Sequence, residues 1–254
     1  MSATGIAVVI AIIGFGAGAA ALGLYLHLRE RLNGQSRALD SLAAFQPLFA
    51  DLWSEEMPRR LAALFAAQRL AKSRGSARGL GNVLVSFIRK RMSGESEGDS
   101  FDDVRLALTI LSGASVRGAQ GVPDLSGIDF HGAVLSGVDM GGFRLAQCRF
   151  DRCRLAGAKL AGADLSGASM MGADLSGADL RRADFSEADF TDADFTGAKV
   201  GGANFTNTNI GGAILAEAAG LSQEQLDQAF GDGGTAVPER MRFVPGRSQR
   251  PRRE

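Results

Sequence analysis

The sequence predicts a mainly β protein in which short repeated units stack into a rod, preceded by one transmembrane helix and a small α-helical block. A large apolar residue recurs at every fifth position from Leu125 to Leu215, a period that neither a helix nor a strand produces. Two residues before most of these positions the side chain is small, usually Ala. Near the start of the chain, Thr4 to Leu28 is a run of 25 residues without a formal charge, taking His27 as neutral. A strict short repeat is typical of a stacked, quasi-one-dimensional architecture.

Residues 1–28 are interpreted as an N-terminal tail and a transmembrane helix, because the uncharged run is long enough to cross about 30 Å of hydrocarbon. The run is too long for the apolar part of a cleaved signal peptide, and no basic segment precedes it. Arg29, Arg31 and Arg37 follow it closely, which predicts a single-pass protein whose C-terminal bulk is cytoplasmic. Gly14 and Gly18 have the spacing of a helix-dimerisation pair, so a homodimer through this span is an open alternative.

Residues 29–118 are expected to form a juxtamembrane and helical region. Apolar side chains recur there at helical spacing. One stripe comprises Leu61, Leu64, Phe65 and Leu70, and a second comprises Val83, Leu84, Phe87 and Ile88. Ser100 and Asp103 have capping-box spacing in front of the last expected helix.

Residues 119–220 contain the five-residue repeat. A polar residue, usually Asp, stands between the small and the large residue, and Ser, Thr or Gly follow, as in "ADLSGASMMGADLSGADLRRADFSEADF". This pattern resembles the pentapeptide repeat family, whose unit is A(D/N)LXX. The resemblance implies a right-handed, quadrilateral parallel β-helix with four units in each coil and with the large and small residues pointing inward. Phe143 at a small position, and Val134 and Ile214 at the Asp position, depart from the unit.

The flanking segments resemble those of bacterial, membrane-anchored members of this family. That resemblance implies a location in the bacterial inner membrane and a HEAT-like helical block whose last helix closes the open first coil, as edge protection requires. At the other end, Ser222 and Gln225 have capping-box spacing, so residues 221–231 are expected to form a C-terminal capping helix. Residues 232–254, which end in "GRSQRPRRE", are predicted to be a disordered basic tail.

Two cysteines, Cys148 and Cys153, fall on the small inward position of the repeat. No third Cys or His accompanies them in the pattern of a metal site. We therefore expect buried free thiols that replace Ala, and neither a disulfide nor a metal or other cofactor.

If residues 20 apart lie one above another, about 4.8 Å apart, the charges of the rod form vertical ladders. Four consecutive units carry a basic residue at the Asp position, namely Arg144, Arg149, Arg154 and Lys159. Stacking places each of them beside an Asp, so we interpret them as cross-strand charge pairs and not as a nucleic-acid site; Arg152 is left between two glycines. A later coil is instead uniformly acidic, with Asp184, Glu187, Asp189, Asp192 and Asp194. This acidic coil is the candidate partner-binding site, and the alternative is that Asp is only the preferred residue of the repeat.

The sequence offers little for catalysis, because its only histidines are His27 and His131 and no known nucleophile, phosphate-binding or zinc motif occurs. We expect a non-enzymatic, membrane-anchored scaffold that presents its walls to an unknown protein partner and does not bind nucleic acid directly. The alternative is a DNA-mimicking inhibitor of a type II topoisomerase, since some members of the family resemble duplex DNA in width and charge. Residues 120–219 carry 8 Lys and Arg against 13 Asp and Glu, which is compatible with mimicry, whereas the anchor and the basic coil are not.

Overall fold

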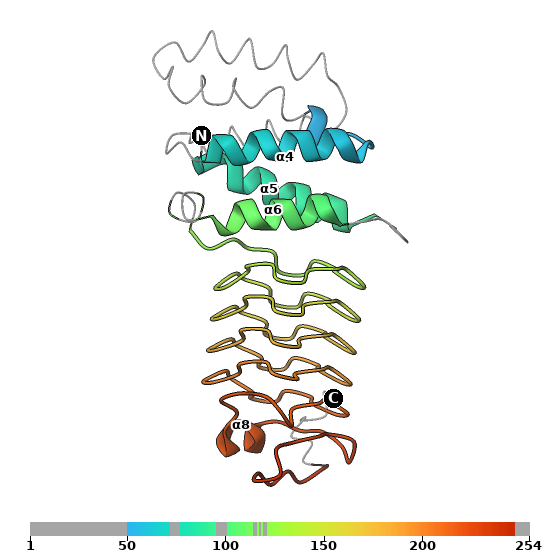
Figure 1. Cartoon of the computed structure of the whole chain (residues 1–254), viewed down its shortest axis with the longest axis vertical. Coiled ribbons are helices and arrows are strands. Elements are labelled where there is room, and N and C mark those ends of the chain that lie inside the picture. Colours follow the sequence, from blue (N-terminus) through green and yellow to red (C-terminus); the bar gives the residue numbers. More distant parts are fainter. Residues whose placement is uncertain are drawn as a thin grey trace, which may run out of the picture.

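The computed structural model describes residues 50–71, 77–94, 101–113, 116, 118 and 121–246. Three helices, α4 (Met57–Ala71), α5 (Ala77–Met92) and α6 (Asp102–Ser112), are stacked on one end of a rod of square coils, and the short helix α8 (Gln223–Gln228) lies at the other end (Figure 1). The predicted transmembrane segment Thr4–Leu28, with its Gly14 and Gly18 pair, lies outside the described residues. Within the described ranges, none of the helices has the length and hydropathy that a bilayer crossing requires.

The helical block is held by apolar side chains from all three helices. Leu64 of α4, Leu84 of α5 and Leu108 of α6 are fully buried, and α6 contacts both other helices. The stripe predicted on α5 is confirmed in its centre, where Leu84 and the residues one turn later lie in the core. On α4, however, Phe65 is 56% exposed, because the buried face of that helix follows small residues such as Ala63 and Ala67 on either side of Leu64.

A buried carboxylate joins the three helices. Asp103 of α6 is fully buried, and its Oδ2 accepts hydrogen bonds from Nε of Arg60 on α4 (2.6 Å) and from Nε of Arg91 on α5 (3.0 Å). The predicted capping box of Ser100 and Asp103 is therefore wrong. The N-cap of α6 is Phe101, which caps with no side-chain hydrogen bond, because two guanidinium groups engage the carboxylate in charge-assisted bonds.

The rod is a parallel β-helix whose register is 20 residues. Every bridge between Asp124 and Ala219 joins residues 20 apart in parallel, from Asp124 with Arg144 to Lys199 with Ala219. This confirms the four-unit coil. The recurring large residues from Leu125 to Leu215 are all fully buried, as are Phe143 and most residues of the small position. Each side of a coil ends in a turn closed by a backbone hydrogen bond, such as Ile128 N to Leu125 O.

Inward side chains fill the narrow core in vertical columns. Phe130 and Phe150 are stacked with ring centroids 4.9 Å apart and nearly parallel planes. Cys148 and Cys153 are buried and free, as predicted, and their Sγ atoms lie 3.1 Å and 2.9 Å from the carbonyl oxygens of Leu125 and a neighbouring Ala. Burial raises the pKa of Cys148 to about 11 and that of Cys153 to about 12, so both are protonated thiols at neutral pH.

The helical block covers the first coil, in agreement with the expectation that a helix closes this end. Figure 1 shows α6 lying across the first coil, with α5 and α4 behind it. Arg89 of α5 donates hydrogen bonds to the carbonyl oxygens of Ser126 (3.0 Å) and Asp124 (3.2 Å). The buried residues of block and rod form one continuous hydrophobic cluster. The otherwise open edge of the first coil is thus packed against α-helices.

At the other end α8 closes the last coil. The predicted capping box forms, since the Ser222 side chain accepts from Gln225 N and the Gln225 side chain accepts from Ser222 N. The predicted disorder from residue 232 onward is wrong for the residues that the structure describes. Ala236 bridges to Ile214, and Phe243 packs on the core. The free backbone edge of the last coil needs hydrogen-bond partners, and this segment supplies them; residues 247–254 lie outside the described part.

Candidate functional site

The surface of the rod is divided into four walls, because successive five-residue units form successive sides of each coil. Wall 1 starts at residues 123–127, wall 2 at 128–132, wall 3 at 133–137 and wall 4 at 138–142, and each continues in the segments 20 residues further along the chain. Outward side chains of one wall therefore lie in vertical ladders, and residues five apart lie on different walls.

The Asp of the repeat has a structural task. The Oδ1 atom of Asp164 accepts hydrogen bonds from the backbone N (3.1 Å) and the Oγ (2.7 Å) of Ser166, and Asp174 accepts the same pair from Ser176. Such bonds to a backbone two residues ahead are the Asx-turn geometry that favours Asp at a chain reversal. An Asp at this position is consequently explained by the turn, whatever else it does.

The structure does not gather the predicted acidic coil on one surface. Asp184 and Glu187 lie on wall 1, Asp189 and Asp192 on wall 2, and Asp194 on wall 3. The three Asp of the repeat position are half-buried, whereas Glu187 and Asp192 are exposed at two successive corners. A single flat partner therefore meets at most two walls at a corner of this coil.

The predicted stacking of like charges is confirmed, with a compensation that the sequence did not suggest. Asp184 is the bridge partner of Asp164 on one side, and on the other side Nδ2 of Asn204 donates to its Oδ1 (2.9 Å). Asn209 donates in the same way to Asp189 (3.0 Å). The amides of the following coil thus offset part of the charge repulsion.

The basic residues of the repeat lie in the predicted ladders. Arg144, Arg154 and Lys159 are bridge neighbours of Asp residues as expected. Arg149 pairs with Asp129 across the ladder at 3.2 Å and also with Asp151 at 2.8 Å.

Hydrogen bonding explains the pKa shift at this pair. Burial alone would raise the pKa of Asp151, but hydrogen bonds from Arg149, from Ser169 and from the backbone N of Met171 lower it overall. Asp151 in turn raises the pKa of the Arg149 guanidinium.

Sequence reasoning missed the pairing of residues two apart. Arg181 lies 2.7 Å from Asp179 on the same wall, and this contact lowers the pKa of Asp179. Residues at i and i+2 of an extended segment point to the same face, so the period of two was the signal that would have identified this pair. Arg152 is exposed, and its side chain extends toward Gly172 of the next coil.

The charges of the repeat region are divided unequally among the walls, which sequence reasoning also missed. Walls 1 to 3 together carry 4 basic and 11 acidic residues. Wall 4 carries four basic and two acidic residues: Lys159, Arg181, Arg182 and Lys199 against Asp139 and Asp179. The rod is therefore acidic on three sides and basic on the fourth.

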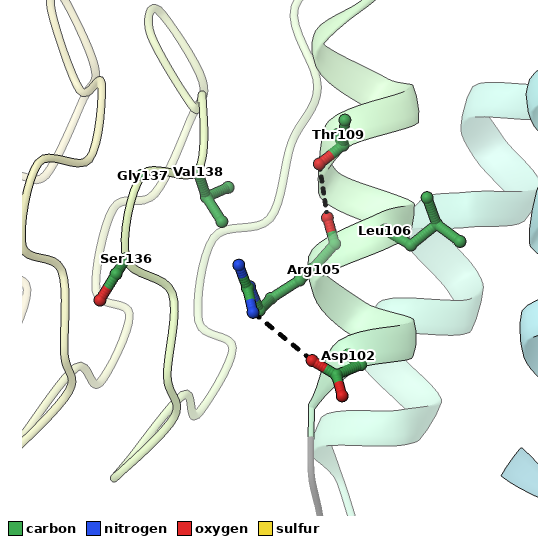
Figure 2. A pocket seen from close by; sticks show the side chains of 7 residues that line it. All are labelled: Asp102, Arg105, Leu106, Thr109, Ser136, Gly137 and Val138. Carbon is green, nitrogen blue, oxygen red and sulfur yellow. Dashed lines mark hydrogen bonds and ion pairs between the residues drawn. The ribbon is translucent and has the colours of Figure 1, made fainter.

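A shallow hollow of about 260 Å³ lies between α6 and the first coils, lined by residues 102–109 and 136–138 (Figure 2). Arg105 points into it and lies 3.4 Å from Asp102. Among the described residues, the Nε of Arg105 is the buried side-chain polar atom that lacks a hydrogen-bond partner. The described part of the chain also contains no group of three His, Cys, Asp or Glu side chains arranged to hold a metal ion.

Comparison with known proteins agrees with this geometry. A family model described as Pentapeptide repeats matches eight copies over residues 123–152, 148–186 and 188–219. No curated protein matches the chain.

Several solved structures are similar to the rod. The pentapeptide repeat protein Rfr23 from the cyanobacterium Cyanothece 51142 is 22% identical, with a TM-score of 0.29, over 45% of this chain and 64% of its own, so the chain spans less than two thirds of that protein. A pentapeptide repeat protein of the Arabidopsis thaliana thylakoid lumen is 37% identical over 42% of this chain and 77% of its own, with a TM-score of 0.27. A trypsin-treated form of QnrB1, a plasmid-mediated fluoroquinolone resistance protein, is 17% identical over 43% and 60%, with a TM-score of 0.28.

Proposed function

Because this chain belongs to the pentapeptide repeat family through residues 123–219, we propose that it is a non-enzymatic, membrane-anchored scaffold whose β-helix presents flat charged walls to a protein partner in the cytoplasm. The observation that carries the proposal is the regular rod, closed by α6 at one end and by α8 at the other. Its outer surface consists of short ladders and turns whose polar groups are satisfied locally, which suits a rigid docking surface.

The acidic coil is the proposed contact site for the partner. Glu187 and Asp192 are exposed at corners, and their backbones have positive φ (60° and 59°), a conformation that costs a non-glycine residue free energy. A basic partner surface would be steered to this coil by charge and would straddle the corner between walls 1 and 2.

Replacement of Asp184, Asp189 and Asp194 by Asn tests this contact. Asn204 and Asn209 already occupy the same repeat position and accept the same turn hydrogen bonds, so the variant is expected to fold. It should melt at a higher temperature, because like charges are removed, and lose its partner in cross-linking of intact membranes.

The control is the replacement of Asp164 and Asp174 by Asn, which makes the same change one coil earlier. We expect this control to keep the cross-linked partner. Retention of the partner by the triple variant at both low and high salt would leave the acidic coil as ordinary repeat consensus.

The anchor is proposed on the run Thr4–Leu28, with the N-terminus outside and the C-terminus in the cytoplasm of a bacterial cell. A reporter fused after Glu254 should behave as a cytoplasmic protein, and periplasmic activity would overturn the topology. Close approach of two spans at Gly14 and Gly18 would give a homodimer, which replacement of both by Leu should abolish.

A second candidate function is mimicry of duplex DNA at a type II topoisomerase, which the three acidic walls favour. The basic wall 4 opposes it, since a DNA mimic needs negative charge around its circumference. Inhibition of topoisomerase supercoiling by the full chain in detergent would favour mimicry over the scaffold.

A further inference from the structure

Wall 4 differs from the other walls in the sign and the arrangement of its charges. Lys159, Arg182 and Lys199 are exposed and lie in three successive coils. Neighbouring coils are about 4.8 Å apart, so these cations form a strip along the rod. Arg181 is paired with Asp179 at 2.7 Å, and those two charges offset each other.

The backbone of wall 4 brings one of these cations to a corner. Arg182 has a φ of 58°, whereas Gly142, Gly162 and Gly202 occupy the same corner in the other coils. The Cγ of Arg182 lies 3.6 Å from the position that a Cβ on Gly202 would take, so its side chain extends over that glycine. The absence of a side chain at Gly202 leaves room for the guanidinium to reach outward between wall 4 and wall 1.

The remaining surface of wall 4 lacks the features of a protein-binding hot spot. Its other outward positions are small residues such as Gly141, Ala161 and Gly201. The large apolar residues that are exposed in the described part of the chain lie elsewhere, including Met171 on wall 2 and Ile214 on wall 3. Protein interfaces need buried aromatic or apolar anchors, and single-stranded nucleic acid needs stacking partners. A flat anionic bilayer surface requires neither and is attracted by a flat strip of cations.

We propose that wall 4 lies against anionic lipid headgroups, which turns the acidic walls 1 to 3 away from the membrane. The inference rests in part on the proposed membrane anchor, because a tether supplies the local concentration that makes weak contacts effective. Each of the three cations should raise the population of the membrane-facing orientation about fivefold over a phosphatidylserine surface. The acidic faces then point into the cytoplasm, where a basic partner can reach them.

The experiment uses the full chain in vesicles and a fluorescent label on a single introduced cysteine. Cys148 and Cys153 are buried, so the label goes to Ala161→Cys on wall 4 or to Ala156→Cys on wall 3. These two alanines occupy the same position of neighbouring repeats and are equally half-buried. A quencher attached to lipid reports the proximity of each label to the bilayer.

With phosphatidylserine present, the label at 161 should be quenched several-fold more than the label at 156. The difference should disappear in vesicles of phosphatidylcholine alone, at high salt, and in the variant Lys159→Gln, Arg182→Gln, Lys199→Gln. Equal quenching at both positions, or a difference that survives in phosphatidylcholine, overturns the inference. Energy transfer between labels at 161 in phosphatidylcholine would assign wall 4 to a second copy of this chain and would also overturn it.

Failure of the anchor is recognised separately. Flotation with phosphatidylcholine vesicles at high salt reports the anchor alone, since no charge attraction operates there. A chain that fails to float overturns the proposed anchor. The wall 4 inference is then overturned only if the triple Gln variant binds phosphatidylserine vesicles as well as the wild-type chain does.

Discussion

At the scale of single residues, the corners of the rod are the positions where the sequence works against the fold. Most corners hold a glycine in the left-handed region, which an L-residue occupies at a cost of roughly 1–2 kcal/mol. Six corners hold another residue with positive φ: Gln147, Arg152, Arg182, Glu187, Asp192 and Asn207. Four of the six are charged, so the strained corners mainly display charge to solvent.

The uncharged corner Gln147 allows a test of this cost without a change in electrostatics. Its φ is 58° and its side chain is exposed, so Gln147→Gly should stabilise the rod by about 0.5–1 kcal/mol once the greater chain entropy of glycine is counted. Denaturant unfolding measures the change. The reverse change Gly157→Gln, at a corner with φ of 65° and no atom near the added Cβ, should destabilise by a similar amount. Shifts of the same sign in both variants would contradict the argument.

The buried thiols give a second prediction at this scale. Burial raises the pKa of Cys148 and Cys153 to about 11 and about 12, from an ordinary value of 9.0. The native protein should therefore resist alkylation at pH 8, whereas the unfolded chain should react at both sites. The folded state holds these protons more tightly, so the contribution of the thiols to stability is complete below pH 9 and is lost as the pH rises from about 9 to about 12. Rapid labelling of the folded chain at pH 8 would show that the core opens.

At the scale of elements, the rod depends on the helices that close its ends. Gln225 of α8 is buried, and its Nε2 donates to the carbonyl oxygens of Val200 (2.9 Å) and Ala203 (2.8 Å). Those carbonyls belong to the last coil, where no further coil can accept or donate. The helix thus satisfies groups that a stack of identical units always leaves free at its end.

Removal of this side chain should open the end of the rod. Gln225→Ala leaves two buried carbonyl groups without donors, which should cost on the order of 2 kcal/mol and expose an edge prone to association. Thermal unfolding and size-exclusion chromatography measure both effects. Gln228→Ala, an exposed position in the same helix, is the control and should change neither. A Gln225 variant as stable and monodisperse as that control would remove α8 from this role.

The helical block depends in the same way on Asp103, which pairs with arginines from two other helices. Asp103→Asn leaves two guanidinium groups near an uncharged side chain, which should destabilise the block by about 3–5 kcal/mol, the range measured when one partner of a buried pair is removed. Asp102→Asn changes the neighbouring carboxylate, whose side chain is 56% exposed, and should have little effect. Circular dichroism during urea unfolding compares the two. Equal midpoints would mean that apolar packing alone holds the helices together.

At the scale of the whole molecule, block and rod form one continuous stack in which each layer touches only its neighbours. Damage at one seam should therefore stay local, as in other repeat proteins. Arg89→Ala removes the hydrogen bonds from α5 to Ser126 and Asp124, so amide exchange should accelerate in the first coil, at Leu125 and Gly127. Exchange at the corresponding amides of later coils, such as Leu165, should be unchanged. Uniform acceleration along the rod would show that the stack opens as a single unit.

The sequence by itself determined the parts of this protein that repeat. A period of five with one large and one small inward residue decides which side chains are buried, including Phe143 and both cysteines, because every unit meets the same surroundings. The capping box at Ser222 and Gln225 was equally local, since both groups lie within one helical turn. The 20-residue register then placed each basic residue beside its expected neighbour.

Only the tertiary structure decided what lies between units and between elements. It placed Asp103 among arginines of two other helices, packed residues 232–246 on the last coil, and distributed the acidic coil over three walls. It also showed that wall 4 alone is basic, because the sign of a wall is a sum over residues 20 apart that no local segment contains. Local spacing fixes which side chains point outward, but their neighbours, and hence their electrostatics, depend on contacts distant in the chain.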